Sequence, residues 1–280
     1  MCRLSWLKKG YDFITAENGF NDDDAVVKLG VGKNMVDAIR YWLRAFGLTN
    51  ESDELQPVAH ELLGPDGYDP YLEDDATLWY LHYLLVKTGR ASIYHLVFNE
   101  YRKQGFSFNR AQLTQFVQRR NAELGNNALN ANTLESDLTI FIRGYSPMEK
   151  EKDRFDAEEE TSGLLQGLGL MSITKGEEVR FHFDNLERPE VPWQVVLRVI
   201  LENEAYSDAI SFTDLEVAPD SPGLVFALNA DGIHRKIKEM KARFPTAVVD
   251  SDTAGNRVLT LKRELIDLEE VMQEYYGNLV

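Results

Sequence analysis

The sequence has almost no cysteine and no long apolar run. Its single cysteine, Cys2, excludes an internal disulfide. Its five histidines show none of the His-x3-His or Cys-x2-Cys spacings typical of a transition-metal site. No stretch approaches the roughly 18 to 20 apolar residues that a membrane span requires. We therefore expect a cytoplasmic protein without a membrane segment or a structural zinc ion.

Positive charge is also scarce. The chain has 280 residues, and its 30 Lys and Arg against 46 Asp and Glu give a formal net charge of -16. A uniformly acidic surface would repel phosphate. The cations are concentrated, however, because residues 26–46 hold four Lys or Arg against one acid and residues 231–244 hold five against two. Residues 149–160 hold seven carboxylates against three cations, which we interpret as a solvated linker.

The first cationic segment has the pattern of two helices joined by a tight turn. Residues 25–29 predict a short apolar helix, Gly30 a turn, and residues 33–46 a helix with its apolar side chains on one stripe. Lys33, Arg40 and Arg44 share the opposite face. This order is that of a helix-turn-helix and favours a nucleic-acid partner. An amphipathic scaffold helix with solvated cations stays open as the alternative.

The second cationic segment repeats this plan near the C-terminus. Pro192 and Ser221-Pro222 each open a predicted helix, and a cationic helix follows before a hairpin of residues 247–250 and 257–261. In that helix the predicted apolar stripe is Ile233, Ile237, Met240 and Phe244, and the predicted outward cations are Arg235, Lys236, Lys238 and Lys241.

Other patterns complete the predicted architecture. Residues 54–58 suit a short wing strand, residues 77–86 predict a helix buried all round, and Asn132 with Glu135 resembles a capping box. The predicted fold is mainly α, with multiple winged-helix or helix-turn-helix units and short β-hairpin wings. Its expected parts are a winged-helix-like unit (1–64), a helical unit with a second helix-turn-helix-like pair (65–145), an acidic linker (146–162) and a C-terminal winged-helix-like unit (163–280).

Several sequence blocks spread along the chain resemble one known family. They are Trp6-Leu7-Lys8-Lys9-Gly10-Tyr11-Asp12, Leu29-Gly30-Val31-Gly32-Lys33-Asn34-Met35-Val36, Ala38-Ile39-Arg40-Tyr41-Trp42, Asp69-Pro70-Tyr71-Leu72-Glu73-Asp74, Ala76-Thr77-Leu78-Trp79 and Thr133-Leu134-Glu135-Ser136-Asp137. Together they resemble the domain-of-unknown-function 4007 family. The match runs in order over most of the chain, and none of the blocks is a common short motif.

This resemblance implies a role in bacterial DNA sulfur modification, in which sulfur replaces an oxygen of a backbone phosphate. Members of the family are similar to the nicking component of single-strand phosphorothioation and phage-defence systems. That component works beside a cysteine desulfurase, an ATPase and a sulfur-transferring pyrophosphatase. The implied function is to bind double-stranded DNA and open one strand. The alternative, from a different class, is a non-enzymatic winged-helix adaptor that binds protein partners.

Strand cleavage of this kind usually uses a divalent cation held by carboxylates. The densest candidates are Asp69, Glu73 and Asp74, which would make the protein a nicking endonuclease dependent on Mg²⁺ or Mn²⁺. The alternative is that Asp74 or Asp75 caps the following helix and that Asp69 forms a turn.

Candidate DNA contacts are the exposed polar residues of the two cationic segments and of the N-terminus. They are Lys8, Lys9, Lys33, Asn34, Arg40, Arg44, His234, Arg235, Lys238 and Lys241. Simple solvated charge is the alternative for each of them.

Overall fold

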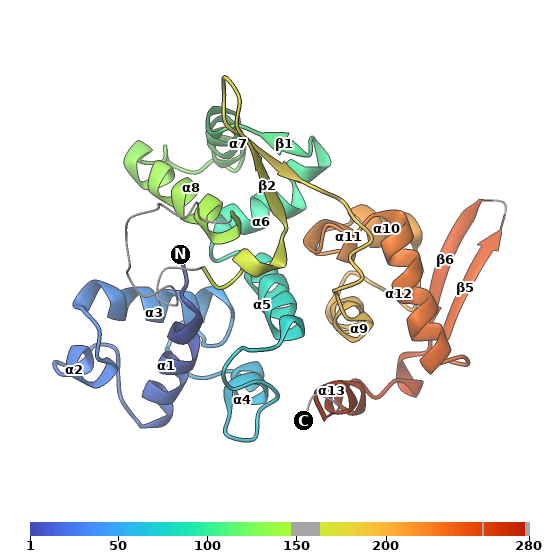
Figure 1. Ribbon diagram of the computed structural model, residues 1–280, viewed down its shortest axis with the longest axis horizontal. Helices are drawn as coiled ribbons and strands as arrows, with labels where there is room; N and C mark the ends of the chain where they lie inside the picture. Colours follow the sequence, from blue (N-terminus) through green and yellow to red (C-terminus); the bar gives the residue numbers. More distant parts are fainter. Residues whose placement is uncertain (147–162, 254, 278–280) are drawn as a thin grey trace. The chain divides into compact units, whose positions relative to one another are not determined.

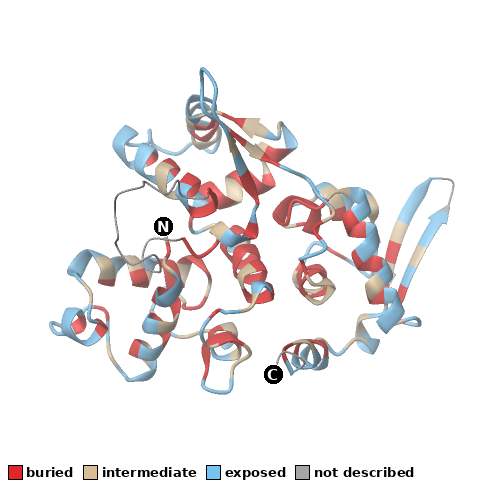
Figure 2. Ribbon diagram, viewed as in Figure 1, coloured by how far each residue is buried: buried red, intermediate tan, exposed pale blue. Residues whose placement is uncertain are grey.

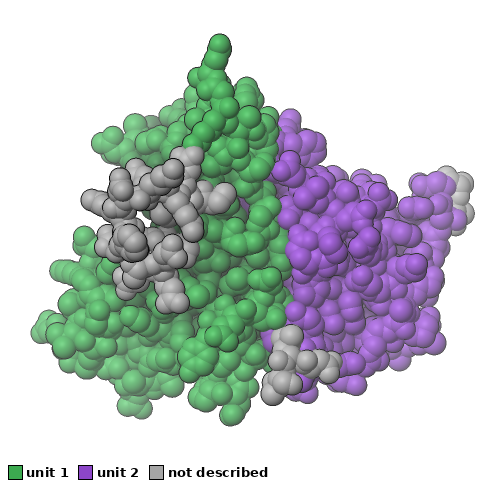
Figure 3. Space-filling model, in the orientation of Figure 1, with its two compact units in different colours: residues 1–96, 107–182 green, residues 97–106, 183–280 purple. Residues whose placement is uncertain are grey.

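The computed structural model describes residues 1–146, 163–253 and 255–277. It forms two compact units, coloured separately in Figure 3. Unit 1 comprises Met1–Leu96 and Ser107–His182, and unit 2 comprises Val97–Phe106 and Phe183–Val280. The described residues are mainly helical and form two small three-stranded sheets, so the predicted mainly α class is confirmed, while its winged-helix units stay a prediction. The predicted four-part division stays a prediction, and most of its acidic linker lies outside the described residues.

The first helices of unit 1 agree closely with the sequence pattern (Figure 1). They are α1 (Leu4–Thr15), α2 (Ala25–Leu29), α3 (Lys33–Ala45) and α4 (Pro57–Leu63). Gly30 ends α2 with φ +65°, a conformation that glycine adopts without steric cost. Helices α1 and α3 approach closely at Gly10, where an added Cβ would lie 2.6 Å from Leu43 Cδ1. The two helices predicted at residues 25–29 and 33–46 are confirmed.

The wing strand predicted at residues 54–58 is wrong. Only an isolated antiparallel bridge joins Thr49 to Leu55, and α4 begins two residues later at Pro57. The physical reason is the proline, whose fixed φ and missing N–H suit the first turn of a helix.

The remaining helices described in unit 1 include one that is buried. They are α5 (Asp75–Thr88), α6 (Ser92–Asn99, which continues into unit 2), α7 (Arg110–Glu123) and α8 (Ala131–Tyr145), with a short 3-10 turn η2 (Gln166–Leu168). Helix α5 is buried along most of its length, as predicted (Figure 2). Inside it, His82 Nδ1 forms a 2.8 Å hydrogen bond with the Tyr145 hydroxyl of α8.

The start of α8 differs from the prediction by a few residues. Its cap is Asn130, which accepts hydrogen bonds from the backbone N–H groups of Asn132 and Thr133 at 2.9 and 3.2 Å. Asn132 therefore lies inside the helix instead of capping it. Asn130 can fill this role equally well because Asn is among the preferred N-cap residues.

The first sheet has the strand order β1-β3-β2, and its strands are β1 (Ser107–Phe108), β2 (Met171–Thr174) and β3 (Arg180–Phe183). Strand β1 pairs antiparallel with β3, with Phe108 opposite Phe181. Both side chains are buried and their rings stack at 5.3 Å. Strands β2 and β3 are neighbours in this sheet, and residues 175–179 connect them.

Unit 2 contains the second sheet and the second cationic helix. Its elements are η1 (Tyr101–Lys103), α9 (Trp193–Glu202), β4 (Ala209–Ser211), α10 (Phe212–Val217), α11 (Pro222–Val225), α12 (Ala230–Arg243), β5 (Val248–Thr253), β6 (Asn256–Leu261), η3 (Arg263–Leu265) and α13 (Leu268–Gly277). The strand order β4-β6-β5 is antiparallel throughout. Among the described residues, no helix has both the length and the apolar character that a membrane crossing needs.

Candidate nucleic-acid interface

The loop of candidate carboxylates before α5 is organised around Asp69. This side chain is only 7% exposed, and its two oxygens accept hydrogen bonds from the backbone N–H groups of Glu73 and Asp74 at 2.9 and 3.0 Å. Asp74 in turn caps α5 by accepting from the N–H of Ala76 at 2.8 Å. The geometry therefore gives Asp69 and Asp74 the turn and cap roles that the sequence left open as alternatives.

This loop does not fit a divalent cation. Both oxygens of Asp69 point at backbone donors, and the described residues contain no group of three or more His, Cys, Asp or Glu side chains that could hold a metal ion. Glu73 is exposed at the edge of the loop. Catalysis by Asp69, Glu73 and Asp74 stays a prediction.

The cations of α3 are bound by one carboxylate of the following loop. Arg40 Nη2 lies 2.7 Å from Asp53 Oδ2, and Arg44 Nη2 lies 2.7 Å from Asp53 Oδ1. Arg44 also donates to the carbonyl oxygen of Glu51 at 2.7 Å. The side chain of Asp53 is only 18% exposed. The two guanidinium groups therefore pair within unit 1, where the Asp53 carboxylate offsets one of their two charges and holds both side chains in place.

The other candidate residues of unit 1 differ in whether their side chains are bound within the unit or exposed. Lys8 Nζ donates to Asp12 Oδ1 at 2.7 Å and to the carbonyl oxygen of Leu63 at 3.1 Å. Lys9, Lys33 and Asn34 are exposed, the last two at the start of α3. Lys33 and Asn34 therefore remain accessible there.

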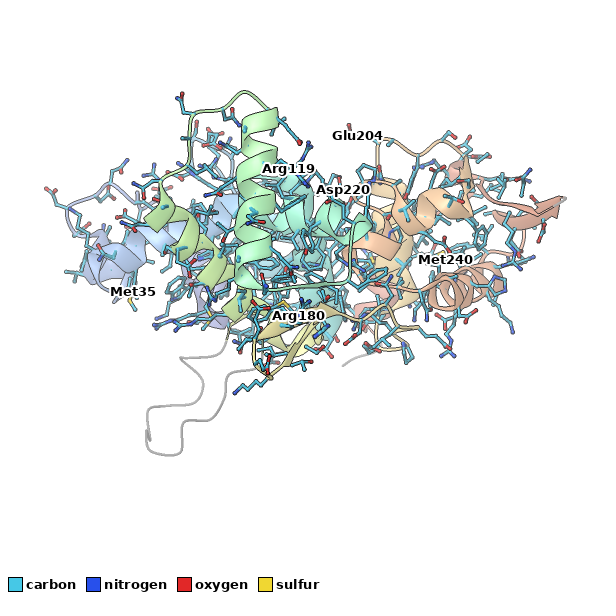
Figure 4. All side chains as sticks on the ribbon, turned by 90° about the horizontal axis from the view of Figure 1, so that it is seen from above. Met35, Arg119, Arg180, Glu204, Asp220 and Met240 are labelled. Atoms are coloured by element: carbon cyan, nitrogen blue, oxygen red, sulfur yellow. The ribbon has the colours of Figure 1, made fainter. Side chains whose placement is uncertain are left out.

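Helix α12 of unit 2 buries Ile233, Ile237 and Met240, as predicted, and packs against α9. Met240 is labelled in Figure 4. The prediction that Lys236 points outward is wrong, because its side chain is 2% exposed. Its ammonium group donates to the carbonyl oxygen of Pro189 at 3.3 Å and lies 3.8 Å from Glu239 Oε2. Burial lowers the pKa of Lys236.

The outer face of α12 carries the four remaining candidates, all exposed. Arg235 pairs with Glu187 at 2.6 Å, and Lys241 pairs with Asp250 of β5. Lys238 lies between them on the helix and makes no ion pair or hydrogen bond with any described residue. It is thus the exposed cation of this face that is available to an external anion.

Two residues that sequence reasoning missed extend this face. Phe212, the first residue of α10, has its ring 6.3 Å from that of His234, and the guanidinium of Arg257 lies 5.7 Å from the same ring. Arg257 comes from the exposed β5–β6 hairpin and also contacts Asp252 at 3.2 Å. Arg257 begins the second strand of the predicted hairpin, so its position and charge could have identified it as a candidate DNA contact from the sequence. No local pattern marked Phe212.

We define the α12 surface as His234, Arg235, Lys238 and Lys241 together with Phe212 and Arg257. It combines one lysine without an ion pair among the described residues, three cations whose partners are exposed or half-buried carboxylates, and an aromatic ring between two nitrogen-bearing side chains. Exposed ion pairs contribute little to stability, so their cations can exchange partners at low cost. This composition suits contact with a phosphate backbone.

The whole chain matches known proteins in both sequence and fold. It belongs to the family described as "Protein of unknown function (DUF4007)", which matches residues 1–276. A magnesium ion-bound SspB crystal structure is similar to it with a TM-score of 0.84, and an SspB crystal structure with a TM-score of 0.82. Each is 27% identical, and each match covers 99% of this chain and 86% of the other. None of the curated proteins matches the sequence.

Proposed function

We propose that this chain is a DNA-binding component of a bacterial DNA phosphorothioate-modification and phage-defence system, in which it opens one DNA strand. Family membership and the likeness of the whole chain to SspB support a place in such a system. Its partners in this proposal are double-stranded DNA and the cysteine desulfurase, ATPase and sulfur-transferring pyrophosphatase of the system. The magnesium-bound SspB gives limited support to dependence on Mg²⁺ or Mn²⁺.

The main support for DNA binding in the proposed function is the α12 surface with the β5–β6 hairpin beside it. We interpret the order α9, β4, α10, α11, α12, β5, β6, with β4 paired to β6, as that of a winged helix. In helix-turn-helix proteins the second helix of the pair enters the major groove. In this proposal α12 is that second helix, and the hairpin that follows it packs against it through β5.

Within this surface, Lys238 is the residue that we expect to contact phosphate most directly. Its ammonium group has no partner to lose among the described residues, whereas Arg235 and Lys241 must first leave a carboxylate. Contact with phosphate releases condensed counterions, so the affinity must fall as salt rises. His234 and Arg257, on either side of Phe212, would then lie along the same backbone.

The proposal is tested by titrating a labelled DNA duplex with the wild-type chain and with Lys238→Glu. We expect the variant to bind about 10-fold more weakly and to show a salt dependence reduced by about one unit of slope. Lys103→Glu is the matched control, since Lys103 is an exposed lysine of unit 2 that lies on η1, outside α12 and the hairpin. Equal losses in the two variants would show that only net charge matters and would overturn the assignment of the surface.

One observation favours the alternative of a non-enzymatic adaptor. The net charge is -16, and the two arginines of α3 are already paired with Asp53. An acidic protein with few available cations suits basic protein partners. If the wild-type chain binds no duplex even at low salt, the adaptor function is favoured and the proposed one fails.

A further inference from the structure

Helices α1 and α4 lie side by side in unit 1, and the loop of residues 64–74 follows α4 (Figure 1). Between the two helices, the hydroxyl of Tyr11 in α1 and Nδ1 of His60 in α4 form a 3.0 Å hydrogen bond. Their rings meet edge to face, with the centroids 5.6 Å apart. Tyr11 is only 3% exposed, whereas His60 is exposed. A buried phenol therefore holds an imidazole ring at the surface of unit 1.

This hydrogen bond fixes which nitrogen of His60 carries the hydrogen. A buried O–H group needs an acceptor, and Nδ1 of His60 is the hydrogen-bond partner of the Tyr11 hydroxyl among the described residues. The phenol therefore donates to Nδ1, so the neutral imidazole carries its hydrogen on Nε2. Nε2 lies on the other side of the ring and has no hydrogen-bond partner in the described part of the chain. It is thus an oriented N–H donor that is available to a ligand.

Lys8, on the same helix as Tyr11, supplies a second donor. Its ammonium group lies 5.2 Å from the centre of the Tyr11 ring, and it donates to Asp12 at 2.7 Å and to the carbonyl oxygen of Leu63 at 3.1 Å. An ammonium group has three N–H donors, so one of them is left without an acceptor among the residues that the structure describes. The two partners fix the position of the ammonium group, and the remaining N–H can bind an external oxygen atom.

The loop after α4 places an exposed aromatic ring next to this lysine. Lys8 Nζ lies 6.0 Å from the centre of the Tyr71 ring, and Tyr71 is 68% exposed. The loop is fixed on both sides of Tyr71, because the N–H of Asp69 donates to the carbonyl oxygen of Leu62 at 3.1 Å and the side chain of Leu72 is buried. Folding gains little from an aromatic ring held in solvent, whereas a nucleobase can stack on such a ring.

We propose that Lys8, His60 and Tyr71 form a subsite for an unpaired nucleotide of single-stranded DNA, with Tyr11 as the positioning residue of His60. The base stacks on Tyr71, and the donors of His60 and Lys8 bind oxygens of the adjoining backbone phosphates. The ligand is an unpaired strand, because the bases of a duplex stack on one another and leave no face for Tyr71. The inference rests on the DNA function proposed above, in which opening one strand supplies such a nucleotide.

Asp12 determines how much of the affinity comes from phosphate and how much from the base. Its carboxylate pairs with Lys8 and offsets the charge of that lysine, and its side chain is 57% exposed. Contacts with phosphate alone are therefore weak at this subsite, and stacking on Tyr71 supplies most of the affinity. The subsite should consequently bind an oligothymidylate more tightly than an abasic strand of the same length.

The test titrates the whole chain with two fluorescent single strands, an oligothymidylate and an abasic strand of equal length, at low salt. The wild type should bind the oligothymidylate about 10-fold more tightly. Tyr71→Ala should lose this preference, and Tyr71→Phe should keep it, because stacking needs the ring and not the hydroxyl. Tyr41→Ala is the matched control and should also keep the preference, since Tyr41 is a 42% exposed tyrosine of unit 1 that lies on α3.

The phosphate donors are tested on the same two strands. His60→Ala should weaken the binding of both strands about 5-fold, because one donor to phosphate is lost. Tyr11→Phe should weaken both as well, and the nitrogen NMR signals of the His60 imidazole should then show a mixture of tautomers in place of the single one fixed by the phenol. Asp12→Asn provides an opposite arm, because it keeps an acceptor for Lys8 without the opposing charge and should strengthen the binding of both strands about twofold.

Equal affinities of the wild type for the two strands, or an unchanged preference in Tyr71→Ala, would overturn the stacking site. Unchanged affinities in His60→Ala would overturn the assignment of the phosphate donors. A labelled duplex titrated in parallel separates this inference from the proposed function. Duplex binding by the wild type without a preference between the two single strands would defeat the subsite and leave the proposed function intact, whereas absence of duplex binding would defeat the proposed function itself.

Discussion

Helices α3 and α12 have similar sequence patterns but use their cations differently. Each begins after a turn, buries an apolar stripe, and carries lysines or arginines on the opposite face. In α3 the two arginines converge on Asp53, while in α12 Lys238 remains exposed and without a partner among the described residues. The difference shows that cations on one helical face do not by themselves define a surface for phosphate.

The segment that follows each helix explains the difference. Asp53 has φ +64°, a left-handed conformation that is strained for a residue other than glycine, and it receives both guanidinium groups of α3. The hairpin after α12 brings Asp250 to Lys241, and Glu187 reaches Arg235, but neither carboxylate contacts Lys238. The single carboxylate of Asp53 thus binds both arginines of α3, so that they stabilise unit 1 and are less available to a ligand.

Replacing Asp53 tests the difference between the paired arginines of α3 and the exposed lysine of α12. It has the largest expected effect on the free energy of unfolding. Asp53→Ala should lower the free energy of unfolding by about 2 kcal/mol, because two partly buried arginines lose their charged partner. The same change should strengthen duplex binding by unit 1, since both cations become available. Urea unfolding followed by circular dichroism measures the first effect and a DNA titration the second.

Asp37→Ala is the matched control for this change. Asp37 is an exposed acid of α3 with no ion pair among the described residues, so its removal should shift stability by less than about 0.5 kcal/mol. Equal stability of Asp53→Ala and the wild type would mean that Arg40 and Arg44 act as solvated charges, and α3 would again resemble α12.

The sequence predicted helix positions well because periodicity and turn residues are local signals. Gly30 marks the end of α2, and the repeated apolar residues of α3 and α12 place both helices within a residue or two. The pairing of Arg40 with Asp53 was beyond such reasoning, because it depends on a loop that folds back across thirteen residues.

The misplacement of Lys236 has a geometric cause. In an α-helix each residue advances about 100°, so Lys236 lies only about 60° from Ile233, at the edge of the apolar stripe. Gly232 on the same side allows a close approach, because an added Cβ there would lie 2.6 Å from the carbonyl oxygen of Glu187. The packed face of α12 is therefore wider than its apolar residues indicated, and Lys236 falls within it.

Replacing the buried Lys236 tests the difference between buried and exposed lysines of α12, and its expected effect on the free energy of unfolding is smaller than that of Asp53→Ala. Its folded-state pKa is lowered by burial, so the charged lysine reduces stability at neutral pH, and stability should rise as pH increases through the lowered pKa. Lys236→Met should raise the free energy of unfolding by up to about 1 kcal/mol at pH 7 and remove that rise. Duplex affinity should stay unchanged, because this lysine is not on the exposed face.

Thermal unfolding at several pH values measures this effect, and Lys238→Met is the control. Lys238 is exposed and no burial separates its charge from water, so its replacement should leave stability within about 0.5 kcal/mol. A variant Lys236→Met that loses stability would mean that the contacts with Pro189 and Glu239 outweigh the cost of burying the charge.

The smallest expected effect concerns the exposed lysine at the start of α3. Lys33 resembles Lys238 in exposure and in having no ion pair among the described residues, but the arginines further along its helix are held by Asp53. A single lysine whose neighbouring arginines are already paired with a carboxylate should bind phosphate only weakly. Lys33→Glu should therefore weaken duplex binding less than twofold, roughly the effect of one screened surface charge. A titration beside Lys238→Glu decides the matter, because a 10-fold loss in both variants would show that DNA uses α3 and α12 alike and that the pairing with Asp53 does not prevent α3 from binding phosphate.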